Sequence, residues 1–213
     1  GENTGRHTVA IVTEMDIPLG KAVGNSLEII EAIETLKNRG PQDLSEVSFV
    51  LAARMLELSG KGKYEECRKL VREAVESGKA LSKFGELIEK QGGNKGIIED
   101  YSLFPQVRHT FEYKAEASGY ISTMKTDSIG VASLELGAGR ETKESSIDYA
   151  AGIYFNKKTV EEGEVLAILY TNREDKISQA CGLLQQAVQI SDSAPVKKPL
   201  ILAYIDSKGV EMT

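Results

Sequence analysis

The sequence predicts an α/β protein in which a strand and a layer of helices are followed by a small β unit, closed by a helix and a strand. Three observations predict this class. The apolar, β-branched run "HTVAIVT" occupies residues 7–13, helical periodicity extends over residues 25–91, and apolar residues recur at every second position over residues 107–171. The change of period divides the chain into segments 1–106 and 107–213.

The first predicted element is the strand at residues 7–13. Its apolar character is continuous, whereas a strand with one solvated face alternates apolar and polar residues. We therefore expect this strand to be covered on both faces, as parallel strands usually are.

A helix follows, with Asn25 as the predicted N-cap and Glu28 three residues later. Gly40 and Pro41 provide the stop signal. Its apolar residues recur at intervals of three and four, which predicts one buried face. They are Leu27, Ile30, Ile33 and Leu36.

Three more helices are predicted over residues 44–58, 64–77 and 81–91, the last ending at a Gly-Gly pair. Together they form a helical layer against the sheet that contains the first strand. In the helix at residues 44–58, four apolar residues are expected to be buried: Val47, Val50, Leu51 and Met55.

The β unit consists of segments with strand-like alternation between glycine-bearing turns. The predicted strand segments are "HTFEYKAEASGYISTM", "GVASLEL", "IDYAAGIYFN" and "EEGEVLAILYT". A helix over residues 173–190 and a final strand at "PLILAYI" close the chain.

Composition excludes several classes of protein. A formal charge of -6, with lysines dispersed among acids, argues against nucleic-acid binding. No apolar run reaches the roughly 18 to 20 residues of a membrane span, and no signal-peptide pattern is present, so we expect a cytoplasmic protein without membrane association. The chain starts at Gly1, in a loop that leads directly into a predicted buried strand, so we expect further polypeptide upstream.

The cysteines and histidines indicate neither a disulfide nor a zinc site. Cys67 and Cys181 lie far apart in helical patterns, and buried thiols are expected. His7 and His109 are isolated in the sequence, and neither has a Cys or Asp at the spacing of a metal-binding motif.

The stretch "EMDIPLGKAVGNSLE" joins an apolar strand to a helix through a glycine-bearing turn, a pattern that presents backbone groups to ligands. Carbonyl groups around Pro18, Leu19 and Gly20, with the Glu31 carboxylate, suit a weakly held hard cation such as potassium, sodium or calcium. Alternatively, Glu28 and Glu31 only complement the helix N-terminus. No organic cofactor is indicated.

Two further motifs each have a functional and a structural interpretation. "LGAGRETK", residues 136–143, has glycines and cations that could hold an anion, but it matches neither standard phosphate-loop pattern and equally fits a turn. Lys125 follows a methionine, as in carrier domains modified on a lysine, but it comes after Gly119, whereas in carriers the lysine precedes the glycine-started strand. No catalytic triad, paired carboxylates or helical His pair is visible.

Three longer strings carry a resemblance to a known family. "TEMDIPLGKAVGNSLEIIEAIETLKNRGPQDL", "IGVASLELGAGRETKESSIDYAAGI" and "VEEGEVLAILYTNRED" closely resemble stretches of bacterial pyrimidine-nucleoside and thymidine phosphorylases, in order and with similar spacing. The resemblance implies that residues 1–106 are the C-terminal part of the large α/β domain. Residues 107–213 would then be the β-rich, barrel-sandwich-like C-terminal domain.

The resemblance also implies an activity. Enzymes of this family split a pyrimidine nucleoside with inorganic phosphate into free base and pentose 1-phosphate. Their phosphate is held by a Lys-Ser/Thr-x-Gly-Gly-x-Gly-Asp segment that this sequence lacks, as it lacks the base-binding motifs. The chain is therefore expected to be a C-terminal half that binds substrates only together with an N-terminal half and is inactive alone.

Site residues and assembly follow from the resemblance in the same way. A cation in the family is held by two main-chain carbonyls and a Glu, which correspond here to Leu19, Ala22 and Glu31. The loop at residues 137–140 is expected to help lock a closed form, without a catalytic role for Arg140 or Lys143. The intact enzyme is expected to be a homodimer through helices outside this chain. A stand-alone, non-catalytic binding or scaffold module is the alternative.

Overall fold

The computed structural model describes residues 1–213 except 141, 157–159 and 197. The described residues form two compact units. The first unit contains residues 1–14, 33–95 and 197–213, and the second contains residues 15–32 and 96–196. These units group the chain differently from the predicted segments 1–106 and 107–213, because the last strands join the first unit and residues 15–32 join the second.

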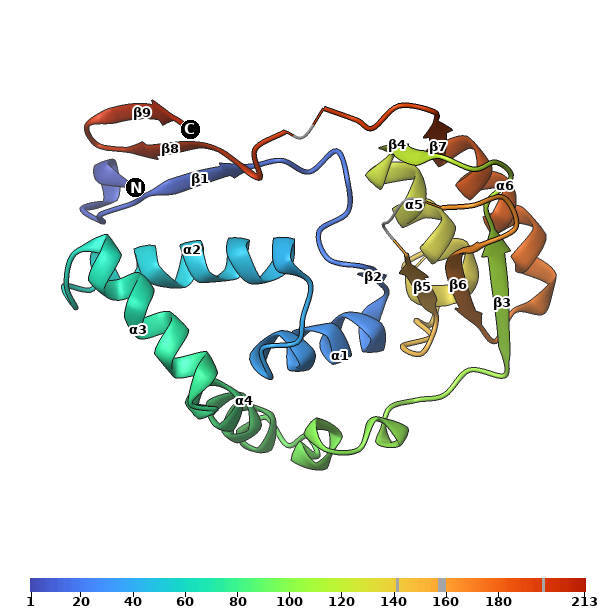
Figure 1. Ribbon diagram of the computed structural model, residues 1–213. Helices are drawn as coiled ribbons and strands as arrows, with labels where there is room; N and C mark the ends of the chain where they lie inside the picture. Colours follow the sequence, from blue (N-terminus) through green and yellow to red (C-terminus); the bar gives the residue numbers. More distant parts are fainter. Residues whose placement is uncertain (141, 157–159, 197) are drawn as a thin grey trace. The chain divides into compact units, whose positions relative to one another are not determined.

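The first unit contains a three-stranded antiparallel sheet in the order β1-β8-β9 (Figure 1). Its strands are β1 (Ala10–Thr13), β8 (Ile201–Asp206) and β9 (Gly209–Met212). The prediction that the first strand is covered on both faces is wrong for this chain, since β1 alternates between exposed and half-buried residues. Its partner is the antiparallel strand β8, which comes from the predicted final strand "PLILAYI".

Three helices complete the first unit, and their predicted positions are confirmed to within two residues. They are α2 (Gln42–Leu58), α3 (Tyr64–Glu76) and α4 (Lys79–Lys90). Ala53 of α2 packs with Cys67 and Val71 of α3 in a buried cluster. The expected burial of Val47 and Val50 is confirmed.

The expected burial of Leu51 and Met55 is wrong, because their exposed fractions are 46% and 70%. The residues of α2 that pack against the cluster shared with α3 are Phe49, Ala52, Ala53 and Leu56. The periodicity of the sequence predicts a helix with an apolar face. Which side of α2 is buried, however, depends on where α3 packs against it.

An arginine joins α2 to α3 and to the sheet. The guanidinium carbon of Arg54 lies 4.0 Å from the ring centre of Tyr64 and 4.8 Å from that of Tyr204 on β8. Arg54 also pairs with Glu57 at 2.7 Å. A cation stacked between two aromatic rings is stabilised by both, so this contact fixes the face of the sheet that carries Tyr204 against α2.

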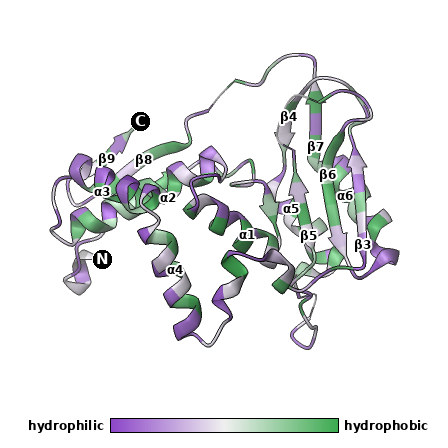
Figure 2. Ribbon diagram, turned by 60° about the horizontal axis from the view of Figure 1, so that its bottom comes forward, coloured by the Kyte–Doolittle hydropathy of each residue, from purple (hydrophilic) through white to green (hydrophobic). Residues whose placement is uncertain are grey.

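The second unit contains two antiparallel sheets. The larger has the order β2-β5-β6-β3 and the smaller pairs β4 with β7. The strands are β2 (Ala22–Val23), β3 (His109–Lys114), β4 (Tyr120–Met124), β5 (Gly152–Phe155), β6 (Val165–Thr171) and β7 (Val188–Ser191). Hydrophobic residues predominate along β5 and β6, the central strands of the larger sheet (Figure 2).

Three helices belong wholly or partly to the second unit. They are α1 (Asn25–Leu36), whose first eight residues lie in it, α5 (Thr126–Ser133) and α6 (Ile177–Ala187). The prediction of a strand at "GVASLEL" is wrong, because this stretch ends α5 and continues as a π-helical turn, Leu134–Ala138. The predicted last helix is too long, since its residues 188–190 belong instead to β7, which pairs with β4.

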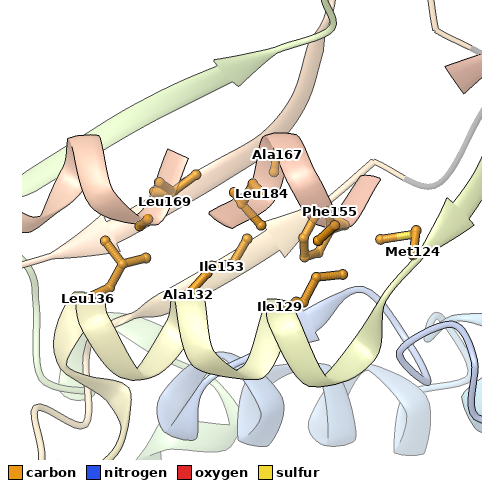
Figure 3. Close-up of a cluster of buried hydrophobic side chains, with 11 residues drawn as sticks. Met124, Ile129, Ala132, Leu136, Ile153, Phe155, Ala167, Leu169 and Leu184 are labelled. Atoms are coloured by element: carbon orange, nitrogen blue, oxygen red, sulfur yellow. The ribbon is translucent and has the colours of Figure 1, made fainter. Parts of the chain in front are cut away.

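The core of the second unit explains the helical conformation of α5. Ile129, Ala132 and Leu136 are fully buried and recur at intervals of three and four, so they line one side of a helix (Figure 3). They pack against β5, β6 and α6. The other members of the core cluster are Met124, Ile153, Phe155, Ala167, Leu169, Ala180, Leu184 and Ala187.

Two glycines allow β2 and β5 to approach closely. A Cβ on Gly24, whose φ is 147°, would lie 2.6 Å from the carbonyl oxygen of Ala151 and 2.8 Å from the Cα of Gly152. Both atoms belong to the backbone and cannot move aside cheaply. Gly24 is therefore required where the chain passes from β2 into α1.

Substituting Gly24→Ala is expected to lower the free energy of unfolding by about 2 kcal/mol or more, through backbone strain and steric overlap. Gly182→Ala is the matched control, because a Cβ there meets no atom within 4 Å and the residue lies inside α6. That control should stabilise by about 0.5–1 kcal/mol. Guanidinium unfolding curves followed by circular dichroism measure both changes, and equal effects would contradict the requirement for Gly24.

Candidate functional site

The loop between β1 and α1 is held by the side chain of Glu31, which is only 7% exposed. Its Oε1 accepts a hydrogen bond from the backbone N–H of Lys21 at 2.9 Å, and its Oε2 accepts one from Ala22 at 3.4 Å. A helix residue thus reaches back by nine and ten positions to the loop that precedes its own helix. The two bonds give each oxygen of this buried carboxylate a hydrogen-bond donor.

Gly20 brings the loop close to this carboxylate. Its φ is +69°, and a Cβ at this position would lie 2.1 Å from Oε2 of Glu31. The position therefore needs glycine both for its backbone angle and for space. The predicted glycine-bearing turn does place backbone next to Glu31.

The register between β2 and β5 orients the backbone of Ala22. The carbonyl of Lys21 accepts a bond from the N–H of Phe155 at 2.9 Å, and Ala22 lies opposite Tyr154. In an antiparallel pair the bonding direction alternates, so the backbone groups of Ala22 point away from β5. The N–H of Ala22 donates to the Glu31 carboxylate, and the carbonyl of Ala22 lies on the same side of the strand.

The structure brings Ala22 and Glu31 together, and Leu19 lies two residues before Lys21 in the same loop. These are the three predicted cation ligands. Among the residues that the structure describes, no group of three or more His, Cys, Asp or Glu could hold a metal ion. The donors available here are one carboxylate and carbonyl oxygens, which fit a hard cation and do not fit zinc. Binding of a cation at these residues stays a prediction.

Tyr154 is a neighbour of this site that sequence reasoning missed. It is 39% exposed, burial raises the pKa of its phenol, and the charge of Glu31 raises it further. Only the pairing of β2 with β5 sets Tyr154 opposite Ala22. No local pattern in the sequence could have identified it, since 131 positions separate the two residues.

The N-terminus of α1 is arranged differently from the prediction. The prediction of Asn25 as N-cap is wrong, because Asn25 is the first helical residue and its Nδ2 donates to the carbonyl of Ala138 at 2.8 Å. The Glu28 side chain instead accepts a bond from the N–H of Gly24 at 2.9 Å. Glu28 therefore stabilises the start of the helix, as its structural interpretation expects.

The glycine-bearing turn at residues 136–140 presents carbonyl groups to its surroundings. Leu136 accepts from the Thr171 hydroxyl at 2.7 Å, Gly137 accepts from the N–H of Asp148 at 2.9 Å, and Ala138 accepts from Asn25. A phosphate loop needs N–H donors directed at the ligand. These contacts therefore favour the turn interpretation. Arg140 and Lys143 are exposed, and residue 141 lies outside the described residues.

Other candidate residues lie apart from this site. Lys125 is exposed and lies between β4 and α5, not at a hairpin tip, so its setting differs from that of a carrier lysine. Cys67 is buried, Cys181 is partly buried, and both are free thiols. His109 lies 3.9 Å from Glu174, and His7 is exposed.

Comparison with known proteins identifies the family. A model of the pyrimidine nucleoside phosphorylase C-terminal domain matches residues 120–191. Pyrimidine-nucleoside phosphorylases from Staphylococcus aureus strains bovine RF122 / ET3-1, USA300 and NCTC 8325 are each 46% identical over 196 residues. The matched region is 90% of this chain and 45% of each relative. The chain belongs to the pyrimidine-nucleoside phosphorylase family.

Within this family the chain corresponds to the C-terminal portion, and it spans a little under half the length of the curated relatives it matches. The resemblance stated from the sequence strings is therefore confirmed. The mixture of helices with several open sheets agrees with the predicted α/β class. Among the described residues, no helix combines the length and the apolar character needed to cross a bilayer.

Substituting Glu31→Gln tests whether this carboxylate holds the loop. The amide offers one acceptor oxygen in place of two, so one N–H of Lys21 or Ala22 loses its partner. Hydrogen exchange at these two amides is expected to accelerate about tenfold. Glu28→Gln is the control, because its one described bond to Gly24 needs a single acceptor, and it should leave both rates unchanged. Unchanged exchange in Glu31→Gln would contradict the assignment.

Proposed function

We propose that this chain is the C-terminal portion of a pentosyltransferase that cleaves a pyrimidine nucleoside with inorganic phosphate, giving the free base and a pentose 1-phosphate. The observation that carries the proposal is the 46% identity over 90% of the chain to proteins named pyrimidine-nucleoside phosphorylase. Identity at this level over most of the chain favours a common role.

The chain supplies structure to this reaction and does not supply the reacting groups. A phosphate that attacks the anomeric carbon needs a preorganised set of amides and cations, with donors directed at the departing base. The sequence lacks the phosphate- and base-binding motifs of the family, and the turn at residues 136–140 offers carbonyls. The isolated chain is accordingly proposed to be inactive.

The proposed role of the loop before α1 is to hold a potassium, sodium or calcium ion. The ligands would be the carbonyls of Leu19 and Ala22 and the carboxylate of Glu31. The support is the burial of Glu31 beside the backbone of Ala22 and the oxygen-only donor set. The remaining ligands would come from polypeptide outside this chain, so binding to this chain alone should be weak.

The proposed setting is the cytoplasm, and the intact enzyme is proposed to be a homodimer. Phosphate and a pyrimidine nucleoside would bind only when an N-terminal half is present. The family resemblance supports these proposals. A stand-alone scaffold with the same architecture is the second candidate. The two are distinguished by activity once the rest of a family polypeptide is present.

Phosphorolysis provides the test of the proposed reaction. The part of the Staphylococcus aureus relative outside the matched region is joined ahead of Gly1, and release of uracil or thymine from uridine, deoxyuridine and thymidine is measured in phosphate buffer. We expect activity in the joined protein and none in the 213-residue chain. A folded, inactive joined protein would favour the scaffold, and activity in the isolated chain would contradict its dependence on the absent motifs.

Calorimetric titration of the isolated chain tests the proposed cation site. Potassium, sodium and calcium chlorides should bind with dissociation constants of about a millimolar or weaker, because few ligands are present. Glu31→Gln should abolish the binding heat, and Glu28→Gln should retain it. Tight stoichiometric binding, or identical heats in the two variants, would count against Leu19, Ala22 and Glu31 as the site.

A further inference from the structure

Three consecutive carbonyl groups in the turn at residues 136–140 each accept a hydrogen bond from a different part of the second unit. The donors are the hydroxyl of Thr171 at the end of β6, the N–H of Asp148 and the side-chain amide of Asn25 at the start of α1. Their distances to the acceptor oxygens are 2.7, 2.9 and 2.8 Å, in that order. The conformation of this turn therefore depends on partners that are far apart in the sequence.

The backbone of the turn can respond to these partners because of Gly137. Its φ is +116°, an angle that residues with a side chain rarely adopt, and it lies inside the π-helical turn Leu134–Ala138. Glycine reaches this angle without a Cβ clash, but it also reaches many others. The hydrogen bonds from outside therefore select one conformation of the turn among several. Arg140 follows directly and is exposed, so the conformation of the turn sets the position of this cation.

Asn25 is also directly connected to the candidate cation loop, residues 19–22, because it follows Ala22 by only three positions. The N–H of Ala22 donates to the Glu31 carboxylate at 3.4 Å. The carbonyl of Val23 accepts a bond from the hydroxyl of Ser133, the last residue of α5, at 3.0 Å. The backbone between the loop and Asn25 is thus bonded both to the helix that leads into the turn and to the turn itself.

The position of Gly137 distinguishes these two bonds. Ser133 precedes the glycine and belongs to α5, whereas Ala138 follows the glycine. A rotation about the backbone of Gly137 leaves α5 in place but moves the carbonyl that Asn25 holds. Asn25 is therefore the contact through which the loop acts on the part of the turn beyond Gly137.

We propose that Asn25 is a positioning residue that couples the candidate cation loop to the turn at residues 136–140, so that an ordered loop holds the turn in one conformation. Two sites are coupled when an event at one changes the equilibrium at the other, and hydrogen bonds between rigid elements carry such effects. A cation bound by the loop would then also restrain the turn. Only this last step rests on the proposed cation site, since the coupling itself rests on the described contacts.

Hydrogen exchange at the N–H of Asp148 in the 213-residue chain tests the coupling, because this amide donates to Gly137 in the turn. Glu31→Gln loosens the loop and should accelerate this exchange at least about threefold. In an Asn25→Asp background the same substitution should cause no further acceleration. Asn25→Asp removes the N–H donor at unchanged size, and an acid in the first turn of a helix is favourable, so the variant should fold.

Thr171→Val is the matched control, because it removes a different bond of the turn, the one to Leu136. In that background Glu31→Gln should still accelerate exchange at Asp148 by the same factor. The backbone amides of β6 report global opening, and circular dichroism confirms that each variant folds. If Asn25→Asp does not fold, Asn25→Ala takes its place.

Potassium, sodium and calcium chlorides test the step that rests on the proposed cation site, with tetramethylammonium chloride as the control for ionic strength. At least one of the three salts should slow exchange at Asp148 in the unsubstituted chain and leave the Asn25→Asp variant unchanged. Coupled effects of the two substitutions, without any effect of these salts, would support the role of Asn25 and reject the cation site.

Three results would overturn the proposal. One is an unchanged exchange rate at Asp148 in Glu31→Gln. Another is the same acceleration by Glu31→Gln in the unsubstituted and Asn25→Asp chains, which assigns Asn25 a purely structural role. The third is an equal acceleration at the amides of β6, which assigns the effect to global unfolding.

Discussion

The buried carboxylate of Glu31 is the contact on which the arrangement of the second unit's candidate site depends. It accepts hydrogen bonds from two backbone N–H groups of the preceding loop, and it lies so close to Gly20 that a Cβ there would displace it. A buried N–H without a partner costs free energy, so the loop and the helix stabilise each other's positions. The same carboxylate faces the side of β2 that is turned away from β5.

Residues 15–32 are joined to the rest of the second unit by contacts on several sides. The carbonyl of Val23 accepts from the Ser133 hydroxyl at 3.0 Å, and Asn25 donates to Ala138. The N–H of Ser26 donates to the carbonyl of Tyr149. The loop and the start of α1 therefore share a unit with the matched family domain at residues 120–191, although they precede it by about a hundred positions. A ligand held by the loop would stabilise the edge of the same sheet.

The first unit illustrates a different constraint, which is the need of a sheet to cover both faces. Arg54, Tyr64 and Tyr204 secure one face through stacking, and Ile201 and Ala203, which alternate with Tyr204 along β8, are buried as well. Leu51 and Met55 of α2 stay exposed, because α3 packs against other residues of that helix.

Local sequence patterns by themselves determined the helices α1 to α4, because periodic apolar residues and Gly or Pro stops act within a few residues of each other. They also pointed to Glu31 and the glycine-bearing loop, since both lie within one short stretch. The tertiary structure decided what depends on distant partners. It set α5 as a helix around Ile129 and Leu136, turned residues 188–191 into a strand beside β4, and placed Tyr154 opposite Ala22. A short apolar run fits a helix or a strand equally well, and the packing surface offered by the rest of the chain selects between them.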